Sequence, residues 1–485
     1  MSEIENRSAE PLSPRVRLSS IEAFHLHSSN DDWPNCVISR YHFRGSIDVE
    51  FARQAWQHCL ARQKHFCRPI EGNSFVGPVL DGSSSDPAKA GTTNSSFHDQ
   101  IVETWPECET EFVLADTNDR GLPKIAVRNG TGFGLWCLRS KSNDKVTLIF
   151  ACDHTLADGA AAVSFVRQWM TVYHNLSTGV QPDQGLVKLD WERWKFRSKL
   201  GLLKWSFIKY LPCQAIGVFG ATKFIFRKFS TIEQKTDSPP ATQKSPGIIG
   251  RTIEPKIVAE LNDRAQRLNV STNSLLMTIL FRAMKRVRSQ LESDQTRYCC
   301  WQERKWIRLV LPIGTRGIAD RKLPSTNKAS IVQIERTFEQ VADADTAAQS
   351  IDREVRIIMG FKLDQTFLIA IRMISAFPKV LRWVAANEKS RGTVVFTNLG
   401  EPFRKTRACN FRDVGGLELQ DYDLCGPIRS GTPLNILWST FRRSISDQPE
   451  VHGRISIHFD RHLFTAAEAK LVADALEREL LDTVF

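Results

Sequence analysis

One segment, residues 146–170, constrains the fold more than any other part of the chain. Its sequence, VTLIFACDHTLADGAAAVSFVRQWM, begins with an apolar stretch at 146–151 that is typical of a buried strand. A short polar loop with His154, Asp158 and Gly159 comes next, followed by an alanine-rich stretch that is typical of a helix. A histidine at the end of a buried strand is held rigidly while its ring stays reachable. The segment therefore predicts a strand–loop–helix unit with His154 as a candidate general base.

The spacing of the loop residues, HxxxDG, is specific. With eleven histidines and average frequencies of Asp and Gly, about 0.04 matches are expected by chance in this chain. His27 and Asp31 serve as an internal control, because they also form HxxxD but Asp32 takes the glycine position in a polar loop. Only His154 has both the glycine and the strand-to-helix setting. The alternative is a structural histidine whose hydrogen bonds are satisfied.

The chemistry of the loop favours a base. A neutral imidazole, with a pKa near ~6.5, can take a proton from a hydroxyl or an amine at neutral pH. Asp158 can either orient the imidazole or pair with a cation from elsewhere in the chain, and Gly159 permits close backbone approach. Cys152 has no partner motif, and the sequence contains no serine elbow. Direct transfer with a histidine base is therefore favoured over a covalent intermediate.

Length and element order predict two domains. A chain of 485 residues is too long for one ordinary hydrophobic core. The sequence TDSPPATQKSP at 236–246 has the composition of a linker, and the halves on either side each mix strands with helices. We therefore expect an α/β (α+β) fold with an N-terminal half at 1–185, a basic aromatic crossover and linker at 186–246, and a C-terminal half at 247–485.

Periodicity places the elements within these halves. Strand-like patterns lie at 38–43, 125–127, 134–138, 307–311, 393–397, 434–439 and 451–459. Helical patterns follow Asp48, a candidate N-cap, and lie at 255–268, 272–290 and 337–387. A last helix is expected after Thr465 and Glu468, which form a capping-box pair. Residues 81–96 are a loop by composition.

The segment 194–229 alternates basic and aromatic residues and contains no acidic residue. This pattern suits a segment that lies on anionic lipid. A second interpretation is a crossover connection whose aromatic side chains pack on the domain while its lysines face water. No recognised nucleic-acid-binding module frames the segment, so we expect no nucleic-acid partner.

Charge and cysteine content narrow the possible partners and the cellular compartment. The net charge of +11 favours an anionic partner, such as a nucleotide-bearing cosubstrate, an acidic carrier protein or anionic lipid. The eleven cysteines are scattered without a CxxC pair, which predicts neither a metal site nor a disulfide framework and fits a reducing cytoplasm. The sequence has no signal-peptide pattern and no apolar run of about 18 residues, so we expect a cytoplasmic protein with membrane association as an open alternative.

Several short motifs, in order along nearly the whole chain, resemble those of the coenzyme A-dependent acyltransferase superfamily. This superfamily includes condensation domains, BAHD acyltransferases and wax ester synthases. The motifs are LSSIEAF at 18–24, DHTLADG at 153–159, NVSTNSLLMTILFRAMKR at 269–286, LPIGTR at 311–316, TNLGEP at 397–402, and the closing strand at 453–460. The histidine motif is specific by itself. The other motifs are individually weak, and they support the resemblance because they occur in the order found in the superfamily.

The resemblance implies two chloramphenicol-acetyltransferase-like sandwich domains with an active-site tunnel between them. His154 would deprotonate the acceptor, an alcohol or amine, which attacks a thioester of coenzyme A or of an acyl carrier protein. Asp158 and Gly159 would shape the loop, with Asp158 paired to Arg316. Tunnel or substrate-binding positions would fall at Asp153, Asn398 and Ser439. The resemblance implies no cofactor besides the thioester cosubstrate, and no metal.

The sequence departs from this family at two places. Condensation domains and wax ester synthases usually carry two adjacent histidines, and Asp153 replaces the first of them. The DFGWG signature of BAHD enzymes is absent, with only DLCGP at 423–427 in its place. The leading hypothesis is an acyltransferase. The alternatives are a carrier-dependent, amide-forming condensation protein and a non-catalytic binding member of the fold.

Overall fold

The computed structural model describes most of the chain. The described residues are 15–29, 35–68, 70–76, 95–102, 112–113, 132–140, 142, 144–197, 209–234, 247–293, 299–387, 391–405, 409–429, 431–443, 450–461 and 463–485. The predicted strand at 125–127 and linker at 236–246 lie outside them. So does the predicted loop at 81–96, except for Ser95 and Ser96, which begin a strand.

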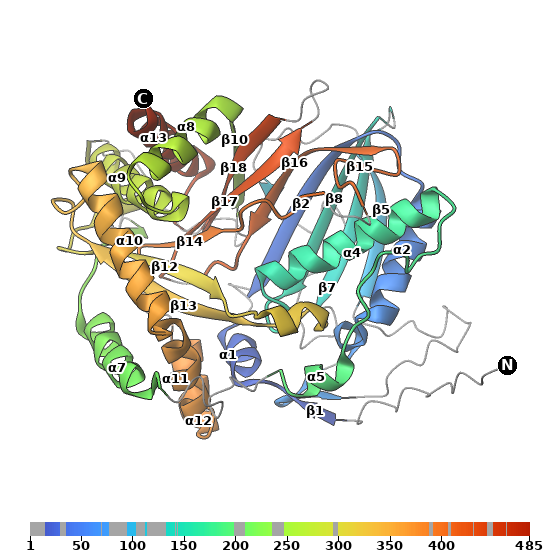
Figure 1. Cartoon of the computed structure of the whole chain (residues 1–485), viewed down its shortest axis with the longest axis horizontal. Coiled ribbons are helices and arrows are strands. Elements are labelled where there is room, and N and C mark those ends of the chain that lie inside the picture. Colours follow the sequence, from blue (N-terminus) through green and yellow to red (C-terminus); the bar gives the residue numbers. More distant parts are fainter. Residues whose placement is uncertain are drawn as a thin grey trace.

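The first lobe is built on a six-stranded sheet (Figure 1). Its strands, in spatial order, are β15 (Asp413–Val414), β16 (Leu417–Cys425), β2 (Cys36–Arg44), β8 (Lys145–Asp153), β7 (Phe133–Ser140) and β5 (Ser95–Val102). All neighbours are antiparallel except β5 and β7. The register places Cys36 opposite Asp153, so β8 ends at the start of β2 and delivers the histidine loop there.

The second lobe is built on a seven-stranded sheet. Its order is β13 (Ala329–Arg336), β12 (Ile307–Gly314), β14 (Val394–Asn398), β17 (Leu434–Arg443), β18 (Glu450–Phe459), β10 (Gly247–Ile253) and β6 (Phe112–Val113). Strands β12, β14 and β17 are parallel, and the other pairs are antiparallel. The remaining strands form two small sheets. One has the order β1 (Arg15–Arg17), β4 (Ser74–Val76) and β3 (Ile70–Glu71), and the other pairs β11 (Cys299–Gln302) with β9 (Thr231–Gln234).

Helices cover both sheets (Figure 1). They are α1 (Ser20–Ser28), α2 (Val49–Arg62), α4 (Gly159–Ser177), α5 (Trp191–Lys195), α7 (Leu211–Phe226), α8 (Pro255–Arg267), α9 (Thr272–Ser293), α10 (Ala344–Gly360), α11 (Thr366–Ile374), α12 (Pro378–Ala386) and α13 (Ala466–Val484), with short 3-10 turns η1 (Lys64–Cys67), η3 (Ile318–Lys322) and η4 (Leu363–Gln365). Asp48 caps α2, and Thr465 forms a capping box with Glu468 on α13, which confirms both predicted helix starts. Within the described residues, no helix is long and apolar enough to cross a bilayer.

Each sheet takes in a strand from the other half of the sequence. Strand β16, from the C-terminal half, pairs with β2 in the first lobe. Strand β6, from the N-terminal half, pairs with β10 in the second lobe. Helix α1 also packs on α11 and α12 of the other half. The two lobes are therefore held together by chain exchange as well as by surface contact.

A buried ion network lies where the two sheets meet. Asp423 on β16 accepts hydrogen bonds from Arg40 Nε on β2 at 3.0 Å and from Arg454 Nε on β18 at 2.9 Å. All three side chains are fully buried. Burial raises the pKa of the Asp423 carboxyl, but Arg454 and Arg40 outweigh burial and hold this pKa below its usual range. Because each buried charge depends on the others, the network fixes how the lobes meet.

Candidate active site

The histidine loop connects β8 to α4 and is anchored from both lobes. The His154 N–H donates to the carbonyl oxygen of Asn35, which precedes β2, at 2.6 Å. The side-chain amide of Asn327, which precedes β13, donates to the carbonyl oxygens of His154 and of Thr155, the latter at 3.1 Å. The position of the imidazole therefore depends on how the two lobes are placed relative to each other.

Asp158 holds the loop in place. Its Oδ1 accepts from the Ala161 N–H at 2.9 Å and so caps α4. Arg316 forms a bidentate pair with the same carboxylate, at 2.8 and 2.9 Å, and the Lys328 N–H donates to Oδ2 at 2.8 Å. Burial raises the pKa of Asp158, but Arg316 and the N–H groups of Lys328 and Ala161 together outweigh burial and lower this pKa below its usual value. The structure thus brings Arg316 to Asp158, as the family resemblance implies, and this pair holds the carboxylate in place.

A second imidazole lies against the first. The rings of His25 and His154 are stacked, with centroids 4.0 Å apart and planes inclined by 22°. The Asn35 amide nitrogen lies 3.0 Å from His25 Nδ1, and donation by this amide leaves the ring proton of His25 on Nε2. Burial lowers the pKa of both histidines, and each of them is therefore neutral at neutral pH.

The stacked pair lines a cavity of about 190 Å³ between the lobes. His154 Nδ1 is buried, so Nε2 is the nitrogen that can face this cavity. Asp158, Gly159 and Arg316 also line it. Most of the wall is apolar and comes from α1, β2, β12, β13, β14 and the residue after it, β16 and β17: Ile21, Val37, Val310, Pro312, Ile331, Val395, Leu399, Leu424, Cys425 and Leu437.

Three predicted tunnel positions are not among the residues that line this cavity. The Asp153 side chain is buried, and its Oδ1 accepts from the Thr155 N–H at 2.8 Å, which supports the loop from beneath. Strand alternation turns Thr397 toward the cavity and Asn398 away from it. The Asn398 Oδ1 accepts from the Gly400 N–H. Ser439 is fully buried, two positions beyond Leu437, a lining residue of β17.

The structure adds lining residues that the sequence did not single out. They include His25, Ser330, Arg391, Arg429, Thr432 and Asn435. His25 directly follows the LSSIEAF motif, which was the one available signal. The two arginines flank β14 and β16, and no motif marks them. Among the described residues, no group of three His, Cys, Asp or Glu side chains could hold a metal ion.

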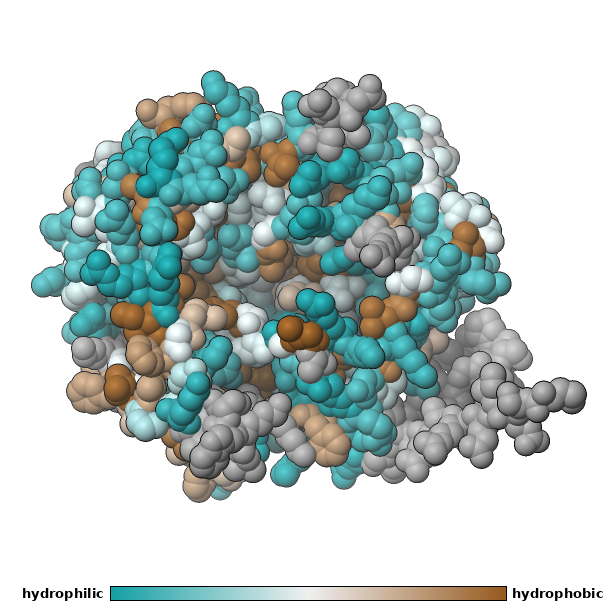
Figure 2. Space-filling view, viewed as in Figure 1, coloured by the Kyte–Doolittle hydropathy of each residue, from teal (hydrophilic) through white to brown (hydrophobic). Residues whose placement is uncertain are grey.

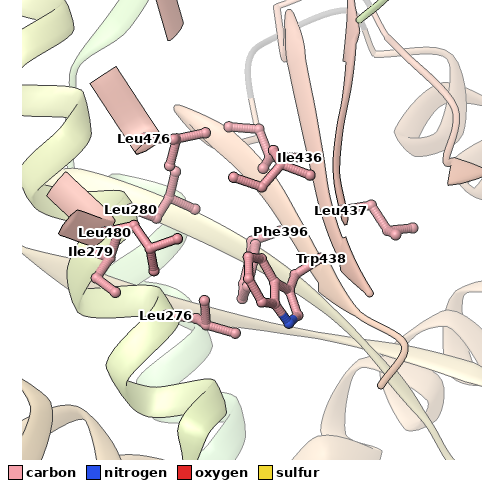
Figure 3. A pocket seen from close by; sticks show the side chains of 10 residues that line it. Leu276, Ile279, Leu280, Phe396, Ile436, Leu437, Trp438, Leu476 and Leu480 are labelled. Atoms are coloured by element: carbon pink, nitrogen blue, oxygen red, sulfur yellow. The ribbon is translucent and has the colours of Figure 1, made fainter. Parts of the chain in front are cut away.

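A further hollow lies inside the second lobe, between α9, α13 and the sheet (Figure 3). Its volume is about 20 Å³. The side chains around it are apolar: Leu276, Ile279, Leu280, Phe396, Ile436, Leu437, Trp438, Ile455, Leu476 and Leu480. A site this small and dry is a gap in core packing, because a bound water would need polar partners.

Fold and site together define a two-lobed protein with a histidine at the interface of its lobes. No protein-family model and no curated protein matches the sequence. Solved structures match over nearly the whole chain. The first condensation domain of the calcium-dependent antibiotic synthetase, in complex with a substrate analogue, has 13% identity and a TM-score of 0.65, covering 97% of this chain and 96% of the other.

Two further structures extend the comparison. The epimerization domain from the third module of tyrocidine synthetase B has 14% identity and a TM-score of 0.60, covering 98% of this chain and 99% of the other. A mutant starter condensation domain of rhizomide synthetase, in complex with C8-CoA and Leu-SNAC, has 13% identity and a TM-score of 0.59, covering 97% and 94%. The chain therefore has the chloramphenicol-acetyltransferase-like fold of condensation domains, which confirms the predicted fold.

Proposed function

We propose that the protein is an acyltransferase in which His154 is the general base. His154 Nε2 takes the proton of an acceptor hydroxyl or amine, and the acceptor attacks the carbonyl carbon of a thioester. The C–S bond then breaks, and the imidazolium returns its proton to the leaving thiolate. The product is an ester or amide, and the released thiol is coenzyme A or the arm of an acyl carrier protein.

The observation that supports this proposal is a neutral imidazole on a cavity between two lobes. Burial keeps His154 unprotonated, and Arg316 neutralises the one carboxylate of the loop. The stacked His25 ring covers one face of the base and fixes its plane. A base that is neutral, oriented and open to a mostly apolar cavity meets the requirements for proton abstraction.

The donor is an anionic thioester in this proposal. The net charge of +11 suits both coenzyme A and an acidic carrier protein. One structural neighbour was solved with C8-CoA and Leu-SNAC, which favours the same donor class here. The neighbours that are condensation domains of synthetases favour carrier-dependent condensation as the second candidate reaction.

Thiol release tests the proposal. The protein is incubated with a panel of acyl-CoAs and acyl carrier proteins, with and without alcohols and amines. Acceptor-dependent release is expected, and His154→Ala should reduce it by about 10²- to 10⁴-fold. His58→Ala is the matched control, because His58 lies on the surface beside Asp183. Unchanged release in His154→Ala contradicts the base assignment, and thioester binding without any release favours a non-catalytic binding protein.

We also propose that the protein contacts anionic membrane surfaces, through α7, α11 and α12 rather than through the whole of 194–229. Trp194 is fully buried and Arg197 pairs with Glu22 at 2.6 Å, so the start of that segment belongs to the domain core. Residues 198–208 lie outside the described residues. By contrast, Phe226 is 82% exposed and Phe219 is 70% exposed on α7.

The exposed apolar side chains of α7 continue over neighbouring helices. Helix α11 contacts both α7 and α12, and Figure 2 shows hydrophobic residues gathered over these helices at the lower left. The side chains include Ile216, Val218, Phe361, Met373, Phe377, Val380 and Trp383. The sequences of α7, α11 and α12 contain no acidic residue, and Arg372, Lys379 and Arg382 are exposed among them. An apolar patch on helices whose charged side chains are all cationic suits the interface of an anionic bilayer.

Vesicle flotation tests this contact. We expect the protein to float with phosphatidylcholine vesicles that contain phosphatidylserine, and flotation to weaken as salt is raised. Phe226→Ser with Trp383→Ser should abolish it. Phe485→Ser is the matched control, since Phe485 is 68% exposed at the C-terminus on another face. Flotation that is absent, or that is insensitive to salt, contradicts the proposal.

A further inference from the structure

Two arginines in the wall of the active-site cavity differ from several buried arginines elsewhere in the protein. Arg391 precedes β14 and Arg429 follows β16, and both are half-buried. Neither has a carboxylate partner among the described residues. A carboxylate does face each of four fully buried arginines elsewhere: Arg40, Arg197, Arg308 and Arg454.

The two guanidinium groups share one aromatic ring. Their Cζ atoms lie 5.1 Å (Arg391) and 5.4 Å (Arg429) from the centre of the Phe24 ring. Arg391 Nη2 donates to the Val384 carbonyl oxygen at 2.8 Å, and Arg429 Nη2 donates to Ser28 Oγ at 2.8 Å. These contacts use a small part of the five N–H donors of each side chain. Within the described residues, the other donors have no protein acceptor, and the cavity is the open space beside them.

The charge of this pair is not balanced by the described residues. Burial, together with Arg391, lowers the pKa of Arg429 to about 9, so the group still carries its charge at neutral pH. Two like charges in a partly desolvated wall repel each other, and a bound anion would relieve this cost. Arg429 is also near enough to lower the pKa of both His25 and His154. The uncompensated charge therefore lies close to the stacked histidines.

We propose that Arg391 and Arg429 form a subsite for the carboxylate or phosphate of a substrate that carries this anionic group besides its reacting group. Guanidinium forks match the oxygens of either anion, and stacking on Phe24 holds the two forks in place. Phe24 precedes His25 in α1, so one helix positions both the anion subsite and the histidine stack. The rest of the substrate lies along the apolar wall. The proposal rests on the proposed function, because it assigns the substrate class of the same cavity.

Direct binding tests the subsite without relying on catalysis. Calorimetric titration compares octanoate and octyl phosphate with octanamide, which has the same chain and no charge. We expect the better of the two anions to bind at least about tenfold more tightly than the amide, because charge-assisted hydrogen bonds replace neutral ones. Octanoate and octyl phosphate as separate arms decide which anion the subsite prefers.

Variants assign the preference to the two arginines. Arg391→Gln and Arg429→Gln should each bring the anion close to the affinity of the amide. Arg404→Gln is the matched control, because it removes one positive charge from an exposed position. Equal binding of anion and amide by the wild-type protein overturns the proposal, whether or not the variants fold, and so does an unchanged preference in both folded variants.

The titration also separates this proposal from the proposed function. His154→Ala should keep the anion preference while it loses acyl transfer. An anion preference in a protein that transfers no acyl group supports the subsite and removes the acyltransferase proposal. Acyl transfer without an anion preference supports the acyltransferase proposal and overturns the anion subsite.

Discussion

The ion pair between Asp158 and Arg316 gives the sharpest test of how the active-site loop is held. We expect Asp158→Asn to lower the free energy of unfolding. The asparagine oxygen can still cap α4 through the Ala161 N–H. Its amide nitrogen would then face Arg316 and the Lys328 N–H, both of which are donors. The variant therefore keeps the cap and loses the remaining acceptor.

The size of the effect follows from these contacts. A buried N–H left without an acceptor costs about 1–2 kcal/mol, which applies to Lys328. The ion pair adds about 1 kcal/mol, because the side chain of Arg316 is 28% exposed and solvent screens it. We expect a loss of about 2–3 kcal/mol in Asp158→Asn. Asp158→Ala also removes the cap and should cost about 1 kcal/mol more.

Urea unfolding followed by tryptophan fluorescence measures these losses, with thiol release measured on the same preparations. Arg316→Gln completes a double-mutant cycle, and we expect a coupling free energy of about 1–2 kcal/mol with Asp158→Asn. A loss below about 0.5 kcal/mol in Asp158→Asn, within the range of ordinary surface substitutions, would refute the structural role. A large loss of activity at unchanged stability would instead mean that Asp158 acts on the imidazole.

Further predictions concern pH and packing. Burial lowers the pKa of His154 below 6.5, so kcat/KM should fall only as the pH drops through that lowered pKa. The pH at which kcat/KM is half-maximal should therefore lie below 6.5. A midpoint above pH 7 in a pH–rate profile would contradict the assignment of His154 as the base. Burial also lowers the pKa of His65 to about 3 and that of His458 to about 4. Below pH 6.5 the unfolded state therefore binds more protons than the folded state. The urea concentration at the unfolding midpoint should fall as the pH drops from 7 toward 4. Gly250→Ala should lower the free energy of unfolding by more than about 2 kcal/mol, because the added Cβ would lie 1.7 Å from Arg454 Nη2. Gly220→Ala is the control, because its Cβ would have no atom within 4 Å, and its urea unfolding should be nearly unchanged.

Local patterns were enough to predict much of the fold. Seven of the eight predicted strands lie in the described residues, and each matches a strand of the structure. The capped helix starts and the strand–loop–helix unit around His154 were also readable, because each depends on residues close together in sequence. The exchange of β16 and β6 between the sheets was not predicted, since strand pairing depends on contacts far apart in the chain.

The sequence by itself determined the candidate base and its loop. HxxxDG between a buried strand and a helix is a local pattern, and the resemblance of LPIGTR to the superfamily's motif implied Arg316 as the partner of Asp158. Only the tertiary structure decided what surrounds the base. It places His25 against His154 and sets Arg391 and Arg429 in the same cavity wall. The physical reason is that stacking and electrostatic interactions act through space, and packing of the two lobes brings together groups that no sequence spacing connects.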